Sequence, residues 1–302
     1  MSGPFLTPSV ARLLEQVASG PTPGPSVPGQ RQALEGAMAA LGWPAPPSLP
    51  APAALPGGGS LLRFFPGDGA SGPVRIVYLH GGSFIAGGAR PHAGIAQALA
   101  AAAGAEVVLV DYRLAPEHPL PAGRDDCVQA ALQVAAEGPL VLVGDSAGGW
   151  LAVETALELA VNAPGAVRRL VLVNPMIGPD SSPEGSQRDF AAGYFASASD
   201  FADAWKLAGP WASQRSRPGG ENADYAVLPP TVVLTNEADP VRDEGEAFAE
   251  RLSRAGVTVL SIRARGVVHA AWLFDAALPE ARLLLDVVSG ALRYEARGSP
   301  SA

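Results

Sequence analysis

Cysteine and lysine are almost absent from this chain of 302 residues, which has one of each. The lone Cys127 excludes an intrachain disulfide, and its place in a helical apolar pattern predicts a small core residue. Lys206 is the only residue able to serve as a Schiff-base lysine or as the base of a Ser–Lys dyad, and it falls in a segment rich in Trp and Ala. Chemistry that depends on a lysine or a thiol is therefore disfavoured.

Long apolar runs are also missing. The longest, Ala98–Val110, is interrupted by Gly104 and Glu106, and we interpret it as a helix followed by a strand rather than as a membrane span. The first residues show no basic stretch followed by an apolar one, so no secretory signal is expected. These absences predict a cytoplasmic protein that does not act on or in a membrane.

Neither an excess of positive charge nor a metal-binding pattern is present. The net charge of −8 and the isoelectric point near 5.0 disfavour a nucleic-acid partner and an anionic membrane surface. The four histidines and one cysteine are scattered without the spacing of metal ligands, so we expect no metal ion and no cofactor. Composition leaves the oligomeric state open, a homodimer included.

Short apolar runs alternate with helical patterns along the chain. Runs of this kind are typical of strands buried on both faces, as in a parallel sheet. The predicted strands are Leu61–Phe65 at an edge, Val74–Leu79, Glu106–Tyr112, Leu140–Val143, Leu170–Val173, Thr231–Thr235 and Val257–Ile262. The predicted helices cover residues 91–103, 122–136, 147–161, 241–255 and 279–294. This alternation predicts an α/β fold with a mostly parallel central sheet flanked by helices.

Two segments do not follow the alternation. Residues 1–56 are rich in Pro and Gly and contain two short helical patterns, one from Thr7 to Gly20 and one from about Gln30 to Leu41. Residues 180–228 are inserted between two strands and are rich in aromatic side chains, namely Phe190, Tyr194, Phe195, Phe201, Trp205, Trp211 and Tyr225. The insertion is either a set of locally packed small helices or a lid over a site at the carboxyl ends of the strands, where α/β proteins bind ligands.

A candidate nucleophile follows the strand Leu140–Val143. The strand stops at Gly144-Asp145-Ser146-Ala147-Gly148, and a helical pattern begins at once. A buried strand, a tight turn with Ser at its apex and a helix form the nucleophile elbow, G-x-S-x-G. The N–H groups at the start of the helix would face an incoming negative charge. A glycine-rich turn without a catalytic role is the alternative, so the partners of the serine decide between the two.

The base is sought first among the histidines. A serine nucleophile needs a base, and the base needs an acid that orients it. In folds with this elbow the residues follow the chain order Ser, then Asp or Glu, then His. Of the four histidines only His269 lies C-terminal to Ser146, so it is the predicted base. A surface histidine without a role is the alternative.

The acid is expected after the strand Thr231–Thr235, where Glu237, Asp239, Asp243 and Glu244 are candidates. Asp239 precedes Pro240, which disfavours helical geometry and leaves Asp239 in the loop. Asp243 and Glu244 fall in the first turn of the next predicted helix, where acids commonly favour the helix dipole. Asp239 is therefore preferred over Glu237 and over the two later acids.

A glycine run after the strand Val74–Leu79 supplies candidate oxyanion donors. His80-Gly81-Gly82-Ser83-Phe84 lies one strand–helix–strand unit ahead of the elbow. Glycines allow backbone N–H groups to approach a ligand closely, as an oxyanion hole requires. An ordinary loop is the alternative. The position of this run before the elbow favours the interpretation that it supplies the second half of an oxyanion hole.

Four motifs in order resemble a known family: HGGSFIAGG at 80–88, DYRLAPEHPLPA at 111–122, GDSAGG at 144–149 and DPVRDEG at 239–245, followed by His269. Over roughly residues 5–290 the chain resembles the hormone-sensitive-lipase-like esterases of the α/β-hydrolase fold, bacterial family IV. The chain departs from the family at two positions. Ser83 stands where a third glycine is usual, and Ala270 stands where glycine is frequent. Because a residue with a Cβ atom resists a positive φ, Ser83 bears on the geometry of the oxyanion hole.

The resemblance implies roles for seven residues. Ser146 would be the nucleophile, Asp239 the acid and His269 the base, and the N–H of Ala147 would join two from Gly81, Gly82 and Ser83 in the oxyanion hole. It also implies a helical cap, with residues 1–56 as cap helices and linker, 180–228 as the cap insertion, and 57–179 with 229–302 as the catalytic core. The predicted protein is a carboxylesterase for short-chain acyl esters of small molecules. An amidase or formamidase with the same triad and a non-catalytic small-molecule receptor are the alternatives.

Overall fold

One sheet organises the molecule. The computed structural model describes residues 5–19, 26–67, 69, 72–178, 185–209 and 223–296. Trp211 and two parts of the predicted insertion, 180–184 and 210–222, lie outside the described residues. Eight strands run in the order β1-β2-β4-β3-β5-β6-β7-β8. They are β1 (Ala53–Ala54), β2 (Ser60–Phe64), β3 (Arg75–Leu79), β4 (Val107–Asp111), β5 (Leu140–Asp145), β6 (Val167–Val173), β7 (Thr231–Ala238) and β8 (Val259–Val268).

The sheet is mostly parallel. β1 and β2 pair antiparallel to each other, and β2 pairs antiparallel to β4. From β4 to β8 all pairs are parallel. The predicted fold class is confirmed, and the predicted edge strand near Leu61 is the antiparallel β2. The two-residue strand β1 was not predicted, because its sequence Ala-Ala carries no alternating pattern.

Helices precede, connect and follow the strands of the sheet. In the described residues they are α1 (Pro8–Ser19), α2 (Val27–Leu41), α3 (Ala89–Ala103), α4 (Leu120–Glu137), α5 (Ala147–Asn162), α6 (Ser186–Asp189), α7 (Ala198–Ala208), α8 (Arg242–Arg254) and α9 (Glu280–Ala296), with short 3-10 turns η1 (Tyr225–Val227) and η2 (Ala271–Leu273). The helix α2 begins three residues before the predicted start near Gln30. Ser26 caps it by accepting a hydrogen bond from the Gly29 N–H (3.3 Å), and Pro28 fits the first turn, where no N–H is needed.

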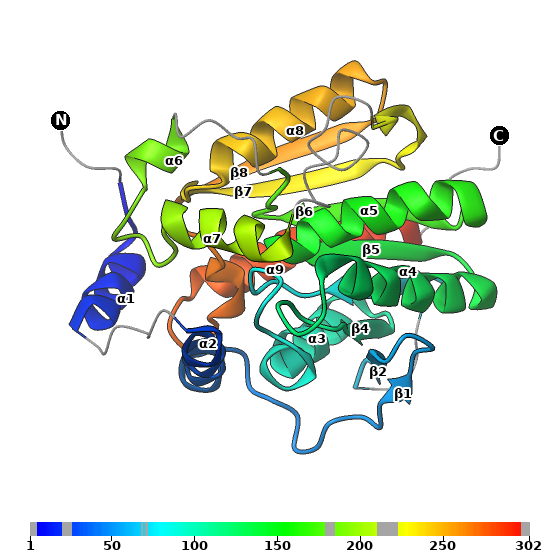
Figure 1. The fold of residues 1–302 in the computed structure, drawn as a ribbon, viewed down its shortest axis with the longest axis horizontal. Helices are drawn as coiled ribbons and strands as arrows, with labels where there is room; N and C mark the ends of the chain where they lie inside the picture. Colours follow the sequence, from blue (N-terminus) through cyan, green and yellow to red (C-terminus); the bar gives the residue numbers. More distant parts are fainter. Residues whose placement is uncertain are drawn as a thin grey trace.

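The alternation of strand side chains divides the core into two layers. Leu140 and Leu142 of β5 pack with α4, α5 and α8, whereas Val141 and Val143 pack with α3 and α9 on the other face. Successive side chains of a strand point to opposite faces, so a strand covered on both sides must be apolar throughout. In Figure 1 the strands spread from β8 near the top to β2 and β1 at the lower right, with α4 and α5 in front of the sheet.

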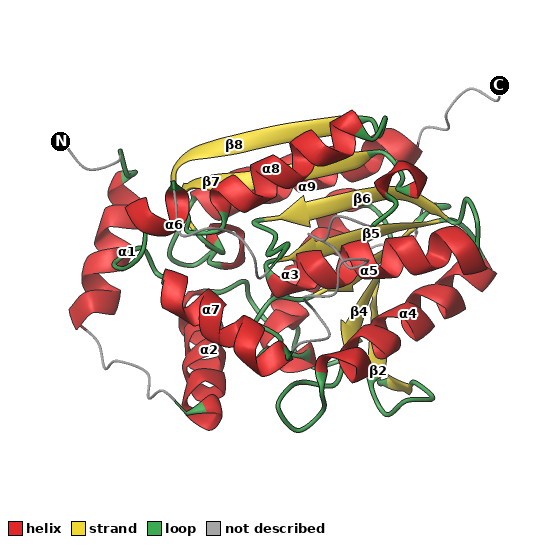
Figure 2. Ribbon diagram, turned by 45° about the horizontal axis from the view of Figure 1, so that its top comes forward, coloured by secondary structure: helices red, strands yellow, loops and turns green. Residues whose placement is uncertain are grey.

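The carboxyl ends of the parallel strands meet at one edge of the sheet. In Figure 2 the arrowheads of β5 and β6 point towards the end of the molecule where α1, α6 and α7 lie. The strands β7 and β8 extend further towards that edge than predicted, to Ala238 and Val268 instead of Thr235 and Ile262. After a shift in register the last pair is Ala238 with Val268. Asp239 and His269 follow this pair directly.

Candidate active site

Ser146 lies at the turn between β5 and α5, with a backbone conformation that few side chains adopt. Its φ is 53° and its ψ is −120°. A Cβ atom at Gly148 would lie 2.0 Å from the carbonyl oxygen of Leu79, and one at Gly144 would lie 2.2 Å from the carbonyl oxygen of Gly148. Both glycines are therefore required by close packing, and the residue between them is held in strain. Such strain is typical of functional turns.

Ser146, His269 and Asp239 form a continuous hydrogen-bonded chain. The Ser146 Oγ lies 3.0 Å from His269 Nε2, and His269 Nδ1 lies 2.8 Å from Asp239 Oδ2. A carboxylate can only accept, so Nδ1 carries the proton and Nε2 is left to accept from the serine hydroxyl. All three side chains are buried. The arrangement has the distances that a nucleophile, a base and an orienting acid need.

The register of the last two strands explains why Asp239 is the acid that reaches His269. Asp239 follows Ala238 and His269 follows Val268, and these two residues are paired, so the two side chains start from neighbouring strands. Glu237 instead accepts a hydrogen bond from the Gly266 N–H at 3.0 Å. Asp243 pairs with Arg242 at 2.7 Å and accepts from the Ser186 N–H at 2.8 Å. The carboxylates that compete with Asp239 in the sequence thus have other partners.

The electrostatic surroundings favour a proton on His269. Burial lowers the pKa of this imidazole, but the charge of Asp239 and the hydrogen bond to it more than compensate. The negative charges of Asp145 and Glu244 act in the same direction. As a result the pKa of His269 is raised above its ordinary value of 6.5. A raised pKa makes the neutral imidazole a better proton acceptor.

The glycine run after β3 bends sharply beside Ser146. Its backbone has positive φ at Gly82 (119°), Ser83 (58°) and Phe84 (63°). Ser83 thus adopts the positive φ that its Cβ atom disfavours. The Gly81 N–H is already donated to the carboxylate of Asp145 at 3.1 Å. Gly81 is therefore engaged within the protein, whereas Gly82 and Ser83 follow it in the run and Ala147 begins α5.

Buried rings stack on both sides of His80, the residue that precedes the glycines of this run. His80 lies between Tyr112 and His92, with ring centroids 4.2 Å and 4.7 Å away. The Tyr112 hydroxyl donates to the His80 carbonyl at 2.7 Å. Burial lowers the pKa of His80 to about 4 and that of His92 well below its ordinary value, so both rings are neutral at pH 7. The two histidines pack as aromatic residues and do not compete with His269 as the base.

Aromatic side chains from the insertion 180–228 pack against the imidazole of His269 and against the rings of Phe84 and Trp150. Phe201 of α7 packs edge-on against the His269 ring, with centroids 5.0 Å apart. Trp205 of the same helix lies 5.2 Å from Phe84 and 6.1 Å from Trp150. The apolar surface of α7 therefore faces the glycine run, the base and the helix that follows Ser146.

The N-terminal helices contact loops around the same edge. The N–H of Thr7, just before α1, donates to the carbonyl of Gly266 in β8 at 3.0 Å. Arg31 of α2 donates to the carbonyls of Ile85 (2.6 Å) and Ala115 (3.1 Å) and pairs with Glu117 at 2.7 Å. Arg31 thereby joins α2 to the end of the glycine run and to the proline-rich loop after β4. No local pattern predicted this contact, because the partners of Arg31 lie more than fifty residues away in the chain.

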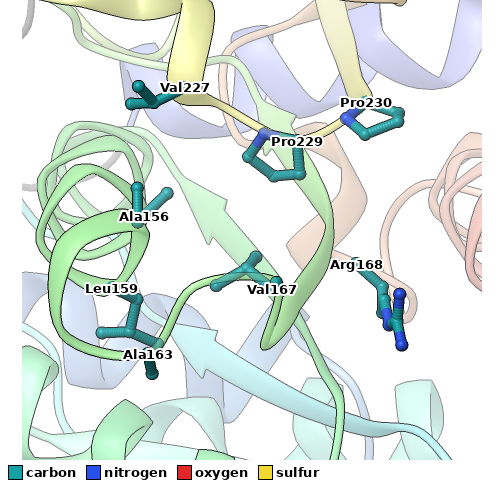
Figure 3. Close-up of a pocket in the computed structure, with 10 residues that line it drawn as sticks. Ala156, Leu159, Ala163, Val167, Arg168, Val227, Pro229 and Pro230 are labelled. Carbon is teal, nitrogen blue, oxygen red and sulfur yellow. The ribbon is translucent and has the colours of Figure 1, made fainter.

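The cavity in Figure 3 is not part of this arrangement. It has a volume of about 350 Å³ and is lined by Ala156, Leu159, Val167 and the prolines 229 and 230, among others. These residues belong to the end of α5, the start of β6 and the segment before β7, so the cavity lies at the amino ends of the strands. Ser146 lies at the opposite edge. The described residues that line the cavity include no serine, histidine or carboxylate, so it is separate from the arrangement around Ser146.

Two further properties concern the described ranges as a whole. Over these ranges no helix combines the length and the apolar character needed to cross a membrane. Nor do three or more His, Cys, Asp or Glu side chains come together there in a way that could hold a metal ion.

Comparisons with known proteins point to one family. Residues 76–273 match a family described as the alpha/beta hydrolase fold. Carboxylesterase NlhH of Mycobacterium tuberculosis is 37% identical over 222 residues, which cover 68% of this chain and 69% of that protein. Ethyl acetate hydrolase of Pseudomonas putida is 32% identical over 217 residues, which cover 67% of each chain.

Solved structures agree with the sequence relatives. The hyperthermophilic esterase from the archeon Pyrobaculum calidifontis superposes with a TM-score of 0.83 at 31% identity, over 97% of this chain and 99% of that chain. The thermostable esterase from Pseudomonas putida ECU1011 gives a TM-score of 0.87 at 25% identity, over 97% and 98% of the two chains. The similarity thus extends beyond the family match, which begins at residue 76, to the N-terminal helices.

Proposed function

The chain belongs to the α/β-hydrolase family, in its hormone-sensitive-lipase-like branch, and from this membership we propose that it is a carboxylesterase for short-chain acyl esters. The observation that carries the proposal is the hydrogen-bonded chain from Ser146 through His269 to Asp239, with distances of 3.0 Å and 2.8 Å. The relatives of this protein are named as ester hydrolases, and this protein is a serine ester hydrolase.

In the proposed reaction Ser146 attacks the ester carbonyl while His269 takes the hydroxyl proton at Nε2. Asp239 keeps the other proton on Nδ1 and stabilises the imidazolium. The N–H groups of Gly82, Ser83 and Ala147 bind the oxyanion of the tetrahedral intermediate, and one such donor is worth roughly 3 kcal/mol of transition-state stabilisation. His269 then gives its proton to the leaving alcohol. Water enters by the same route, and hydrolysis of the acyl-enzyme restores Ser146.

The proposed preference for short acyl chains rests on the aromatic side chains around Ser146. The ring centroid of Phe201 lies 5.0 Å from that of His269, and the ring centroid of Trp205 lies 5.2 Å from that of Phe84. We propose that α7 and the N-terminal helices together roof the site and limit its volume. Each buried methylene favours binding by about 0.8 kcal/mol, so activity should rise with chain length while the pocket has room. Beyond that length a further methylene clashes or protrudes, and the gain reverses.

The test is a series of dissolved p-nitrophenyl esters hydrolysed by the full chain and by Ser146→Ala. The wild type is expected to work best on acyl chains of about two to eight carbons, within the limits that pocket size sets. Ser146→Ala is expected to lower kcat by about 10⁴ to 10⁶ without loss of folding, because the triad acts as one unit. Wild-type rates in that variant would refute Ser146 as the nucleophile.

Two outcomes would point to the alternative functions. An acyl anilide that is cleaved faster than the matching ester would identify an amidase. Saturable ester binding without turnover would identify a receptor. A preference for long-chain emulsified esters, with faster turnover at the interface, would overturn the closed pocket and indicate lipase activity.

A further inference from the structure

Asp145 is a buried carboxylate between the nucleophile and the oxyanion donors, and the proposed reaction does not use it. It ends β5, immediately before Ser146, and is 2% exposed. One of its oxygens, Oδ1, accepts from the Tyr78 hydroxyl at 2.7 Å and from the Gly81 N–H at 3.1 Å. A single oxygen therefore joins β3, the glycine run and the nucleophile elbow.

The same carboxylate sets the path of the glycine run by close packing. A Cβ atom at Gly81 would lie 2.5 Å from Asp145 Oδ2 and 3.2 Å from the Cβ of Ser146. Only glycine fits there, and the chain passes directly over Asp145. Leu79 of β3 pairs with Gly144 of β5, so the two loops leave neighbouring strands at the same level. The run is thus fixed at its first glycine by a hydrogen bond and by lack of space.

We propose that Asp145 is a positioning residue for the oxyanion hole, acting by holding the Gly81 N–H so that the next two N–H groups are presented to the substrate. The proposal rests on the proposed esterase function. It explains why Gly81 is not itself a donor to the substrate. Asp145 occupies the variable position of G-x-S-x-G, and its partners are 64 and 67 residues away in the chain.

The charge of Asp145 has a second effect, which is on the pKa of His269. Burial raises the pKa of Asp145 to about 6, while the bonds from Tyr78 and Gly81 and the nearby imidazole of His269 favour the charged form. In return the carboxylate raises the pKa of His269, together with Asp239 and Glu244. Tyr112, which directly follows β4, also lies within electrostatic reach of Asp145.

Two variants separate the hydrogen bond from the charge. Asp145→Asn keeps an amide oxygen that can accept from the Gly81 N–H but removes the charge. We expect kcat to fall about tenfold, with KM within twofold, because the loss concerns the transition state. We also expect the acid limb of the kcat/KM profile to move to lower pH, because the imidazolium loses a negative neighbour. Asp145→Ala removes both, and kcat is expected to fall about 10²- to 10³-fold, as for a lost oxyanion donor.

A pair of tyrosine variants guards against a merely structural effect. Tyr78→Phe removes the phenol that orients Asp145 and is expected to lower kcat about fivefold, the loss of one ordinary hydrogen bond. Tyr112→Phe is the matched control, since its equally buried hydroxyl donates to the His80 carbonyl and not to Asp145. It is expected to lower stability to a similar degree while the acid limb stays in place.

The outcomes separate this proposal from the proposed function. An inactive wild type, or an active Ser146→Ala, would refute the esterase mechanism itself. If the wild type is active and Asp145→Ala keeps the wild-type kcat, Asp145 has no positioning role. An effect on KM alone would also overturn the proposal. A trifluoromethyl ketone, which forms a tetrahedral oxyanion adduct with a serine, gives an independent measurement: its inhibition constant should rise in Asp145→Ala in parallel with the fall in kcat.

Discussion

At the amino ends of the strands every positive φ in the described connections from helix to strand belongs to a glycine: Gly104, Gly138, Gly165 and Gly256. At the carboxyl ends a positive φ is found in residues that carry a side chain, namely Ser83, Phe84, Ser146, Asn174 and Ala270. A left-handed conformation costs a residue with a Cβ atom about 1–2 kcal/mol, which glycine avoids. The chain thus avoids the strain at one edge of its sheet and keeps it at the other.

Charges differ between the two edges in the same way. At the amino ends Glu106 is paired with Arg63 at 2.7 Å and with Arg75 at 3.1 Å. At the carboxyl ends burial raises the pKa of Asp145 to about 6 and lowers that of His80 to about 4. At one edge the charges are stabilised by pairing, whereas at the other burial favours the neutral forms of Asp145 and His80. Strained backbone and shifted pKa values together are typical of functional sites.

The largest expected effect is on the acid of the proposed triad. Asp239→Asn should lower kcat by about 10⁴, because the amide favours the wrong imidazole tautomer. Glu237→Gln and Asp243→Asn are the matched controls at the same edge, and both should keep most of the rate because their carboxylates have other partners. Ester hydrolysis by the three variants checks this. A larger loss in Glu237→Gln than in Asp239→Asn would show that the acid has been misassigned.

At the amino edge a change of charge should affect stability and leave catalysis alone. Glu106→Gln breaks a pairing in which the carboxylate is 6% exposed in its side chain. We expect the free energy of unfolding to fall by about 2–3 kcal/mol, below the usual range for a fully buried pair because both arginines are partly exposed. Urea denaturation measures the loss. A kcat/KM within twofold of wild type is expected, and a fall in parallel with stability would break the contrast between the edges.

The pH dependence should report the raised pKa of His269. Only the neutral imidazole accepts the serine proton, so kcat/KM should rise as the pH passes the pKa of His269. Because that pKa is raised, the midpoint should lie above 6.5, and the rate should fall about tenfold per unit below it. The profile from pH 4.5 to 9 on a dissolved ester checks this, and a midpoint below 6.5 would contradict the effect assigned to Asp239.

The smallest expected effect compares one backbone conformation at the two edges. Ala270 has φ 60° and ψ 12°, and Gly104 has φ 64° and ψ 35°. Ala270→Gly should raise the free energy of unfolding by about 1 kcal/mol and lower kcat several-fold, because it relieves strain beside His269. Gly104→Ala should lower stability by about 1 kcal/mol and leave kcat unchanged, since an added Cβ meets nothing within 4 Å. Equal effects on kcat would show that strain at the site has no role.

Local patterns sufficed for much of this architecture. The runs buried on both faces predicted the parallel strands, because such strands must be apolar throughout. The ends of the last strands were missed, since Arg263 to Gly266 carry no apolar signal and the pairing with β7 holds them in the sheet. The prediction for the second helix also started late, because Ser26 and Pro28 were not taken as its cap.

The same limit applies to the site. Ser146 and His269 were predicted from the elbow and from chain order, and Asp239 was predicted from the Pro240 that follows it; the three side chains lie in one hydrogen-bonded chain. Asp145 and Arg31 were not found, because their roles depend on neighbours brought together only by the fold. Gly81 was predicted as a possible oxyanion donor, because nothing in the HGGSF motif shows that its N–H is donated to Asp145.

The terminal pair of β7 and β8 limits how the length of this protein can vary. Residues can be added to a surface loop at little cost, because both ends of the loop stay where they are. One residue added between Leu234 and Asp239 would instead turn the following side chains to the other face and displace the carboxylate by about 3.3 Å. Its 2.8 Å bond to His269 would be lost without any change of amino acid at the site. For this pair of strands the number of residues matters as much as their identity.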